Sequence, residues 1–141
     1  MTVVIRVFDR RDADAVVALW HDAGLARPWN DPYADIERKL TVHPELFLIA
    51  EDAGRIVGSV MAGYDGHRGW IYYLASAADR RGEGIGRALV TEAERRLIAM
   101  GCPKVQLMVR TDNAHVMAFY DRLGYERFDV GMTGKRLIAD A

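Results

Sequence analysis

A glycine-rich loop separates a strand-like run from a helix-like run near the middle of the chain. Residues 70–76 are mostly aromatic and aliphatic, which is typical of a β-strand. From residue 85 to residue 100, apolar side chains recur every three or four positions, which indicates an amphipathic helix. The loop between them has glycines at 82, 84 and 86. Glycine lets the backbone approach a ligand closely, and the first N–H groups of a helix are free to bind anions. This order therefore predicts a cradle for a phosphate group.

The spacing of these glycines excludes two common nucleotide-binding loops. The dinucleotide pattern G-x-G-x-x-G fails because its last position falls on Arg87 when counted from Gly82, and on Leu89 when counted from Gly84. A P-loop needs Gly-Lys followed by Ser or Thr, and the chain has no such run. The loop therefore predicts neither a Rossmann enzyme nor an NTPase.

Strand-like and helix-like runs alternate along the whole chain, without a repeat, a low-complexity tract or a linker. For 141 residues this predicts a single domain over 1–141 with a mixed α/β architecture. We expect strands at 3–8, 46–51, 55–64, 70–76, 104–109, 125–130 and 132–138, and helices at 9–24, from 32 to before 44, at 85–100 and at 114–123.

Composition and charge exclude several other classes of protein. A lone cysteine cannot form an intrachain disulfide, so a disulfide scaffold is excluded. A net charge of −1 without a polybasic run argues against binding to nucleic acid. The apolar run at 3–5 is too short for a signal peptide or a membrane span, so we expect a cytoplasmic protein that does not contact membranes. The four histidines lack metal-ligand spacing, and we expect no metal.

A second pattern follows the predicted strand at 104–109. Asn113 precedes a helix-like run that ends in Phe119-Tyr120-Asp121-Arg122-Leu123-Gly124-Tyr125. This run matches [FL]-Y-[ED]-[KR]-x-G-[FY], and residues 81–86 match R-x-x-G-x-G. With both patterns in this order, nearly the whole chain resembles the GNAT superfamily of acyl-CoA-dependent N-acetyltransferases. The residues at 27–32, 63–69 and 101–104 are similar to its YpeA-type bacterial branch.

The resemblance implies a fold and an activity. The expected α/β (mixed α+β) GNAT-like fold has a central, mostly antiparallel twisted sheet of six to seven strands, with about four helices, splayed at the cofactor site. The implied cosubstrate is acetyl-CoA. The acetyl group would move directly to a primary amine of a small molecule, amino acid, peptide or protein within a ternary complex. The alternative left open is a CoA-responsive binding or regulatory module without efficient transfer.

The resemblance also implies roles for individual residues. Tyr120 would be the general acid, since a phenol with a pKa near 10 keeps its proton at neutral pH. The pyrophosphate would lie on the backbone of 81–87, and the pantetheine arm would pair with the strand end at 74–76. Asn113 would contact that arm, and it also fits as the cap of the following helix. The implied cofactor-binding residues are Leu74, Ala75, Ser76, Arg81, Gly82, Glu83, Gly84, Ile85, Gly86, Arg87, Asn113 and Tyr120.

The acceptor side is less defined by the sequence. No carboxylate lies in the strand at 70–76, so the general base stays open among Glu51, Asp65, His67 and Tyr72, and an amine of low pKa would need no base. Walls of the acceptor site are expected at 27–35, at 64–68 and around 132–135. The substrate-binding candidates are Trp29, Asn30, Tyr64, Asp65, His67 and Tyr72. The expected partner is an amine acceptor substrate. A homodimer is the assembly left open.

Overall fold

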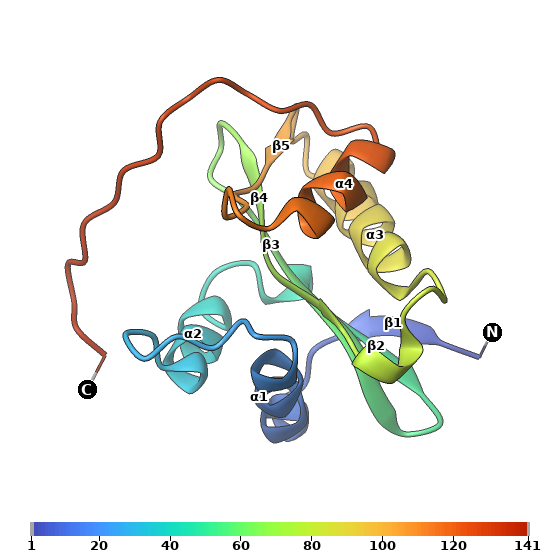
Figure 1. The fold of residues 1–141 in the computed structure, drawn as a ribbon. Helices are drawn as coiled ribbons and strands as arrows, with labels where there is room; N and C mark the ends of the chain where they lie inside the picture. The colour runs from blue at the N-terminus through green and yellow to red at the C-terminus, as the bar shows by residue number, and fades with distance from the viewer. Residues whose placement is uncertain (1, 141) are drawn as a thin grey trace.

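The computed structural model describes residues 2–140, which form an α+β fold with four α-helices and a five-stranded sheet (Figure 1). The strands are β1 (Val4–Val7), β2 (Phe47–Asp52), β3 (Arg55–Tyr64), β4 (Gly69–Ser76) and β5 (Val105–Gln106), and the α-helices are α1 (Ala13–Asp22), α2 (Pro32–Lys39), α3 (Ile85–Ala99) and α4 (Ala114–Arg122). Short 3-10 turns are η1 (Arg10–Asp12), η2 (Pro44–Leu46) and η3 (Ala78–Arg80).

The sheet is mostly antiparallel and splits at one place. Its strands lie in the order β1-β2-β3-β4-β5, and the first three pairings are antiparallel. β5 runs parallel to β4 and pairs with it only at Gly69–Val105 and Trp70–Gln106. Beyond Trp70, β4 continues to Ser76 without a neighbour on that edge. The splayed sheet that the GNAT resemblance implies is therefore present.

Helices cover both faces of the sheet. α1 and α2 lie on one side, whereas α3 and α4 lie on the other (Figure 1). Every residue of β3 from Val57 to Ala62 is buried, as expected for a central strand between two layers. Trp20 of α1 is fully buried, and its indole N–H donates to the hydroxyl of Ser59 at 2.9 Å. The helix layers thus hold the split sheet between them.

A β-bulge interrupts β4 next to the split. Ser59 pairs with Ala75 and Met61 pairs with Tyr72, so two residues of β4 stand opposite a single residue of β3. Tyr73, one of the two, has a φ of +52°, which is uncommon for a residue other than glycine. The Ser59 hydroxyl donates to the carbonyl of Tyr73 at 3.0 Å and so helps to hold this conformation.

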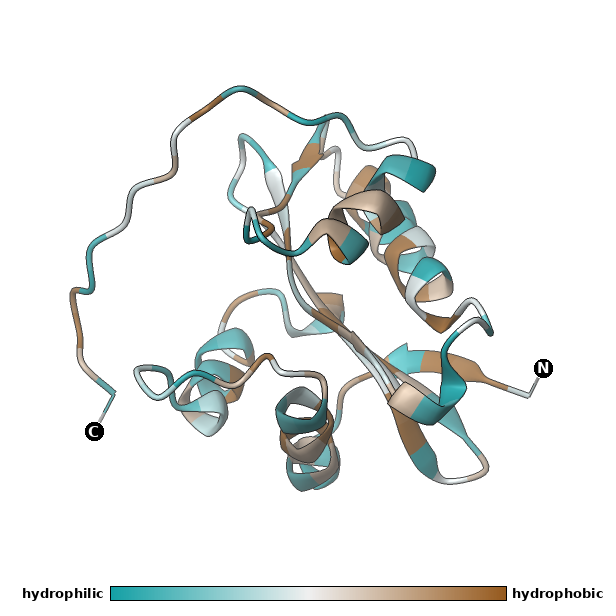
Figure 2. Cartoon of the chain, viewed as in Figure 1, coloured by the Kyte–Doolittle hydropathy of each residue, from teal (hydrophilic) through white to brown (hydrophobic). Residues whose placement is uncertain are grey.

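The strands expected at 125–130 and 132–138 do not form within the described residues, and the strand expected at 104–109 is limited to Val105–Gln106. The sheet therefore has five strands instead of six to seven. Residues 126–140, here called the C-terminal arm, run as an extended segment that arches away from the sheet and returns near α2 (Figure 1). Figure 2 shows apolar positions along the arm. A strand needs a neighbouring edge to pair with, and the arm pairs with none among residues 2–140.

Candidate active site

The glycine-rich loop leads directly into α3. Gly84 caps the helix with a φ of +81°, a conformation that favours glycine. The first helical N–H with a carbonyl partner is that of Ala88, which donates to Gly84 at 3.0 Å. The N–H groups of Ile85, Gly86 and Arg87 precede it and have no backbone carbonyl partner within residues 2–140. They form a free, positively polarised helix end of the kind that binds phosphate.

Charged side chains around the loop fall into two groups. Arg80 is held in place, because its guanidinium donates to Asp52 at 2.9 Å and to Glu83 at 2.7 Å. It therefore ties the loop to the end of β2. Arg81 and Arg87 are exposed and form no ion pair in the described part of the chain. Their charge is available to an anion, whereas Glu83 offers only its backbone.

Two glycines set how closely α3 packs. A Cβ atom on Gly58 of β3 would lie 2.7 Å from Cγ2 of Ile85 and 2.9 Å from Cδ1 of Leu89. A Cβ atom on Gly86 would lie 3.3 Å from the ring of Phe119 in α4. Gly58 thus lets the first turn of α3 rest on the sheet, and Gly86 lets α4 approach that turn. The role of Gly58 was not apparent from its place in a strand-like run.

A cavity of about 760 Å³ opens at the split between β4 and the chain after β5. Leu74 lies on its β4 side and residues 107–110 lie opposite. Asn113 and Tyr120 of α4 line it as well. The cavity thus brings together three of the predicted cofactor-binding residues, whereas Ala75, Ser76 and the loop at 81–87 lie outside its lining.

Asn113 caps α4 in the structure. Its side-chain oxygen accepts a hydrogen bond from the N–H of Val116 at 3.2 Å, which confirms the capping role considered from the sequence. Because the cap uses only the oxygen, the amide N–H groups of Asn113 have no partner among residues 2–140. They are available to a ligand in the cavity.

Tyr120 differs from most other tyrosines of the chain. Its side chain is 7% exposed and packs edge-on against Phe119 and Tyr125, with ring centroids 5.0 and 5.2 Å away. Tyr73 and Tyr125 donate their hydroxyls to Asp35 and Glu94, but the hydroxyl of Tyr120 has no partner in the part of the chain described. Burial raises the pKa of Tyr120 above its ordinary value. A protonated, unpartnered phenol therefore lines the cavity.

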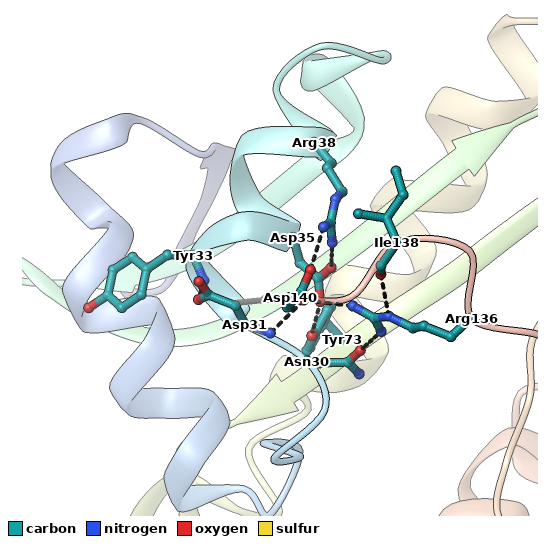
Figure 3. A network of polar contacts seen from close by, with 9 residues as sticks. All are labelled: Asn30, Asp31, Tyr33, Asp35, Arg38, Tyr73, Arg136, Ile138 and Asp140. Carbon is teal, nitrogen blue, oxygen red and sulfur yellow. Dashed lines mark hydrogen bonds and ion pairs between the residues drawn. The ribbon is translucent and has the colours of Figure 1, made fainter.

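The α2 side of the cavity carries most of its charge. Arg27, Arg38 and Lys39 line this side, and Asp35 is the one carboxylate among the lining residues. The Asp35 carboxylate accepts the hydroxyl of Tyr73 at 2.5 Å and pairs with Arg38 at 3.1 Å (Figure 3). Burial lowers the pKa of Lys39. This wall is predominantly cationic.

The end of the C-terminal arm is anchored on the same wall (Figure 3). The carboxylate of Asp140 accepts the backbone N–H of Asp31 at 2.7 Å and a guanidinium N–H of Arg38 at 2.5 Å. Arg136 of the arm pairs with Asp140 at 2.8 Å and also donates to the side-chain oxygen of Asn30. These donors hold the pKa of Asp140 well below its usual range.

The structure separates the predicted acceptor residues into two groups. Asn30 and Tyr72 line the cavity, but Trp29, Tyr64, Asp65 and His67 do not. The Asp65 carboxylate accepts the backbone N–H of His67 at 2.8 Å, and it also stabilises the β3–β4 turn through Arg68.

Among the base candidates, Glu51 pairs with Arg6 at 3.1 Å and lies outside the cavity.

Tyr73 lines the cavity beside Tyr72 although neighbours in a regular strand point to opposite faces. The bulge explains this, and the sequence carries no signal for it.

Residues 2–140 contain no helix that is long and apolar enough to cross a membrane. Nor do they contain a group of three or more His, Cys, Asp or Glu side chains that is placed to hold a metal ion.

Comparison with known proteins places the chain in a family. The sequence model of the acetyltransferase (GNAT) family matches residues 13–125. An acetyltransferase of Yersinia enterocolitica is 57% identical over 136 residues, 96% of either chain, and one of Pectobacterium atrosepticum has the same identity and coverage.

The fold is also shared with solved structures. The structure of AAC(6′)-Iy with a CoA-containing bisubstrate analogue superposes with a TM-score of 0.80 at 16% identity, covering 98% of this chain and 100% of that one. A chain of the NatC complex bound to Gag peptide and CoA superposes with a TM-score of 0.78 at 26% identity. The match covers 92% of this chain and 87% of that one. With this family match over most of its length, the chain belongs to the GNAT family and is an acetyl-CoA-dependent acetyltransferase.

Proposed function

We propose that this acetyltransferase transfers the acetyl group directly to a primary amine, with Tyr120 as the general acid. The observation that carries the proposal is the cavity at the split sheet. It combines the open edge of β4 at Leu74 with a protonated phenol that has no partner in the described residues. An acyl chain and an amine have room to meet there without a covalent enzyme intermediate.

The reaction follows from the groups around the cavity. The free N–H groups at the start of α3 hold the pyrophosphate of acetyl-CoA, and the unpaired edge of β4 aligns the thioester. The amine nitrogen attacks the carbonyl carbon, so that a C–N bond forms and the C–S bond breaks. Backbone N–H groups on the β4 edge stabilise the oxyanion that forms in between. The nitrogen loses one proton, and the sulfur of CoA gains one.

Tyr120 supplies the proton for the sulfur. Because burial raises its pKa above the ordinary value near 10, its phenol is protonated at neutral pH. The proton is delivered as the C–S bond breaks, and the proton released by the amine restores the phenol through solvent. Asn113, with its free amide N–H groups, binds the pantetheine arm beside it.

The acceptor binds at the α2 wall of the cavity. Asp35 attracts the ammonium form of the amine, since it is the one carboxylate in the lining. Arg27, Arg38 and Lys39 favour an acceptor that carries an anionic group in addition to its amine. Arg38 already binds a carboxylate in the structure, that of Asp140, which an acceptor carboxylate would replace.

Release of free CoA from acetyl-CoA over a panel of amines tests the proposal. The panel pairs amino acids with their amides, so that each pair differs in one negative charge. We expect turnover, and a lower KM for the acids. Acetyl-CoA binding without turnover on any amine would instead support the CoA-responsive module, and absence of binding would refute both.

The variant Tyr120→Phe tests the acid. Removal of a general acid costs about 10²- to 10⁴-fold in rate, so kcat should fall within that range while the Kd for acetyl-CoA changes little. Tyr33→Phe, outside the cavity, is the control and should keep the full rate. Full activity in Tyr120→Phe would exclude this residue as the acid.

A further inference from the structure

A carboxylate on the wall of the active-site cavity is held in place by two hydrogen-bond donors. Asp35 of α2 is the one carboxylate among the described residues that line the cavity. Its Oδ2 atom accepts the hydroxyl of Tyr73 at 2.5 Å, and its Oδ1 atom accepts an Nη1–H of Arg38 at 3.1 Å (Figure 3). One donor on each oxygen fixes both the position and the orientation of the carboxylate.

The tyrosine that holds this carboxylate is fixed at the split in the sheet. Tyr73 is part of the β-bulge and directly precedes Leu74, on the open edge of β4. Its ring stacks on that of Trp20 with the centroids 3.9 Å apart, and its carbonyl accepts the Ser59 hydroxyl at 3.0 Å. The bulge thus connects Asp35 to the edge of β4 along which the thioester is proposed to lie.

The Asp35 carboxylate can accept a further proton. A carboxylate has about four lone-pair positions, and Tyr73 and Arg38 use two of those on Asp35. The side chain is 24% exposed and lines the cavity. Burial and the hydrogen bond to Asp35 raise the pKa of Tyr73, so this phenol keeps its own proton at neutral pH. Of the two bonded groups, the carboxylate is therefore the proton acceptor.

The bases considered from the sequence are less suitably placed. Glu51, Asp65 and His67 lie outside the cavity lining. Tyr72 lines the cavity, but burial raises its pKa, so it stays protonated at neutral pH. None of the four combines access to the cavity with a free proton-accepting group.

Lys39 is the remaining candidate, because burial lowers its pKa and it lines the cavity. Its Nζ atom lies 3.8 Å from the position that a Cβ of Gly63 would take. Gly63 pairs with Trp70, which precedes Leu74 by four residues, or about 13 Å of strand. Lys39 therefore lies toward the far end of β4 from the split, whereas Asp35 is bonded to the residue next to Leu74.

We propose that Asp35 is the general base of the transfer reaction and that Tyr73 is the residue that positions it. As the C–N bond forms, the amine nitrogen becomes positively charged and its proton passes to an oxygen of Asp35. The C–S bond then breaks, and the sulfur takes the proton of Tyr120. Because α2 and α4 lie on opposite faces of the sheet, one proton leaves on one side of the cavity and the other arrives from the opposite side (Figure 1). Asp35 afterwards releases its proton to solvent. This assignment rests on the transfer reaction proposed above.

Rescue by small anions tests the base. Asp35→Ala should lower kcat about 10²- to 10⁴-fold while the Kd for acetyl-CoA changes little. Formate fits the space left beside Tyr73 and Arg38, and it should restore part of the rate in proportion to its concentration. Nitrate has the same charge and a similar planar shape but almost no basicity, so it should not restore the rate.

Two further variants serve as controls. Asp35→Asn keeps the shape of the side chain and leaves no space for an anion, so its rate should stay low with formate or nitrate. Glu37→Ala removes another carboxylate of α2, one that pairs with Arg10 outside the cavity, and should keep the full rate.

The results that would overturn the assignment are distinct from failure of the proposed function. Full activity in Asp35→Ala or Asp35→Asn, or no response of Asp35→Ala to formate, would refute a base at this position. Equal rescue by nitrate would show that Asp35 acts through its charge alone. Absence of turnover by the unaltered chain on every amine would instead refute the transfer reaction itself.

A double-mutant cycle tests the positioning role of Tyr73. Tyr73→Phe removes one hydrogen bond to the carboxylate and should lower kcat roughly 10-fold. The same change in an Asp35→Ala background should have no further effect, because Tyr73 acts through Asp35. Equal losses of rate in the two backgrounds would refute that role.

Discussion

The contact between Gly58 and α3 makes a quantitative prediction. In Gly58→Ala the new Cβ would lie 2.7 Å from Cγ2 of Ile85 and 3.2 Å from the carbonyl oxygen of Ala75. Carbon atoms prefer a separation of about 3.5–4.0 Å, so the first turn of α3 must move by roughly 1 Å. Such overpacking costs about 1–3 kcal/mol. For a domain of this size, it should lower Tm by roughly 2–12 °C.

The same displacement should weaken cofactor binding. A hydrogen bond of about 2.9 Å between a helix N–H and a phosphate oxygen is largely lost when it lengthens by about 1 Å. Loss of one such bond to a charged group, worth about 1.5–3 kcal/mol, raises the Kd for acetyl-CoA by roughly 10- to 100-fold. Calorimetric titration and thermal unfolding measure the two effects.

Two matched variants isolate the cause. Gly63 lies on the same strand as Gly58, and the nearest atom to a new Cβ there would be 3.8 Å away. Gly63→Ala should therefore leave both the Tm and the Kd for acetyl-CoA unchanged. Ile85→Ala removes the methyl group that clashes and should partly restore the affinity of Gly58→Ala. Unchanged acetyl-CoA affinity in Gly58→Ala would refute the reasoning that this glycine positions the phosphate-binding helix end.

Three other predictions follow from the site and the helices. Gly86→Ala should lower kcat as well as acetyl-CoA affinity in steady-state assays, because its Cβ would push on the ring of Phe119. Asn113→Ala should lose about 1 kcal/mol of helix stability and raise the KM for acetyl-CoA, whereas Asn113→Asp should keep the cap and raise only KM. Arg95 and Arg96 lower the pKa of Glu92 from 4.5 to about 2, so its stabilisation is present above the ordinary pKa and is lost as the pH falls to about 2. Glu92→Gln should therefore lose less Tm between pH 7 and pH 3 than the unaltered chain.

Local patterns were sufficient to predict the strand, loop and helix that form the proposed cofactor site. The helix expected at 85–100 is Ile85–Ala99, and the glycine before it has the left-handed conformation that its position requires. Asn113 and Tyr120 were placed by a resemblance over the next helix, and both line the cavity. Each of these features depends on residues that are close together in the sequence, so it can be predicted from a single sequence.

Features that depend on distant residues were not predictable in the same way. The bulge at Tyr73 arises from the register between β3 and β4, and no residue type signals it. Alternating apolar residues at 128–132 indicate a strand, but the pattern does not say which edge the strand joins. The expected sixth and seventh strands are absent for this reason. The residue types are suitable, but the arm pairs with no strand edge within the described residues.

Two glycines of the loop have different structural roles, and together they connect the proposed cofactor site to the proposed acid. Gly84 adopts the left-handed conformation that ends the loop, so its role is conformational. Gly86 is within the helix and is needed because Phe119 lies against it. Phe119 in turn packs edge-on against Tyr120. A loop whose glycine spacing is typical of phosphate binding thus also positions the phenol. In the proposed mechanism, cofactor binding and proton donation would therefore both depend on the contact between Gly86 of α3 and Phe119 of α4.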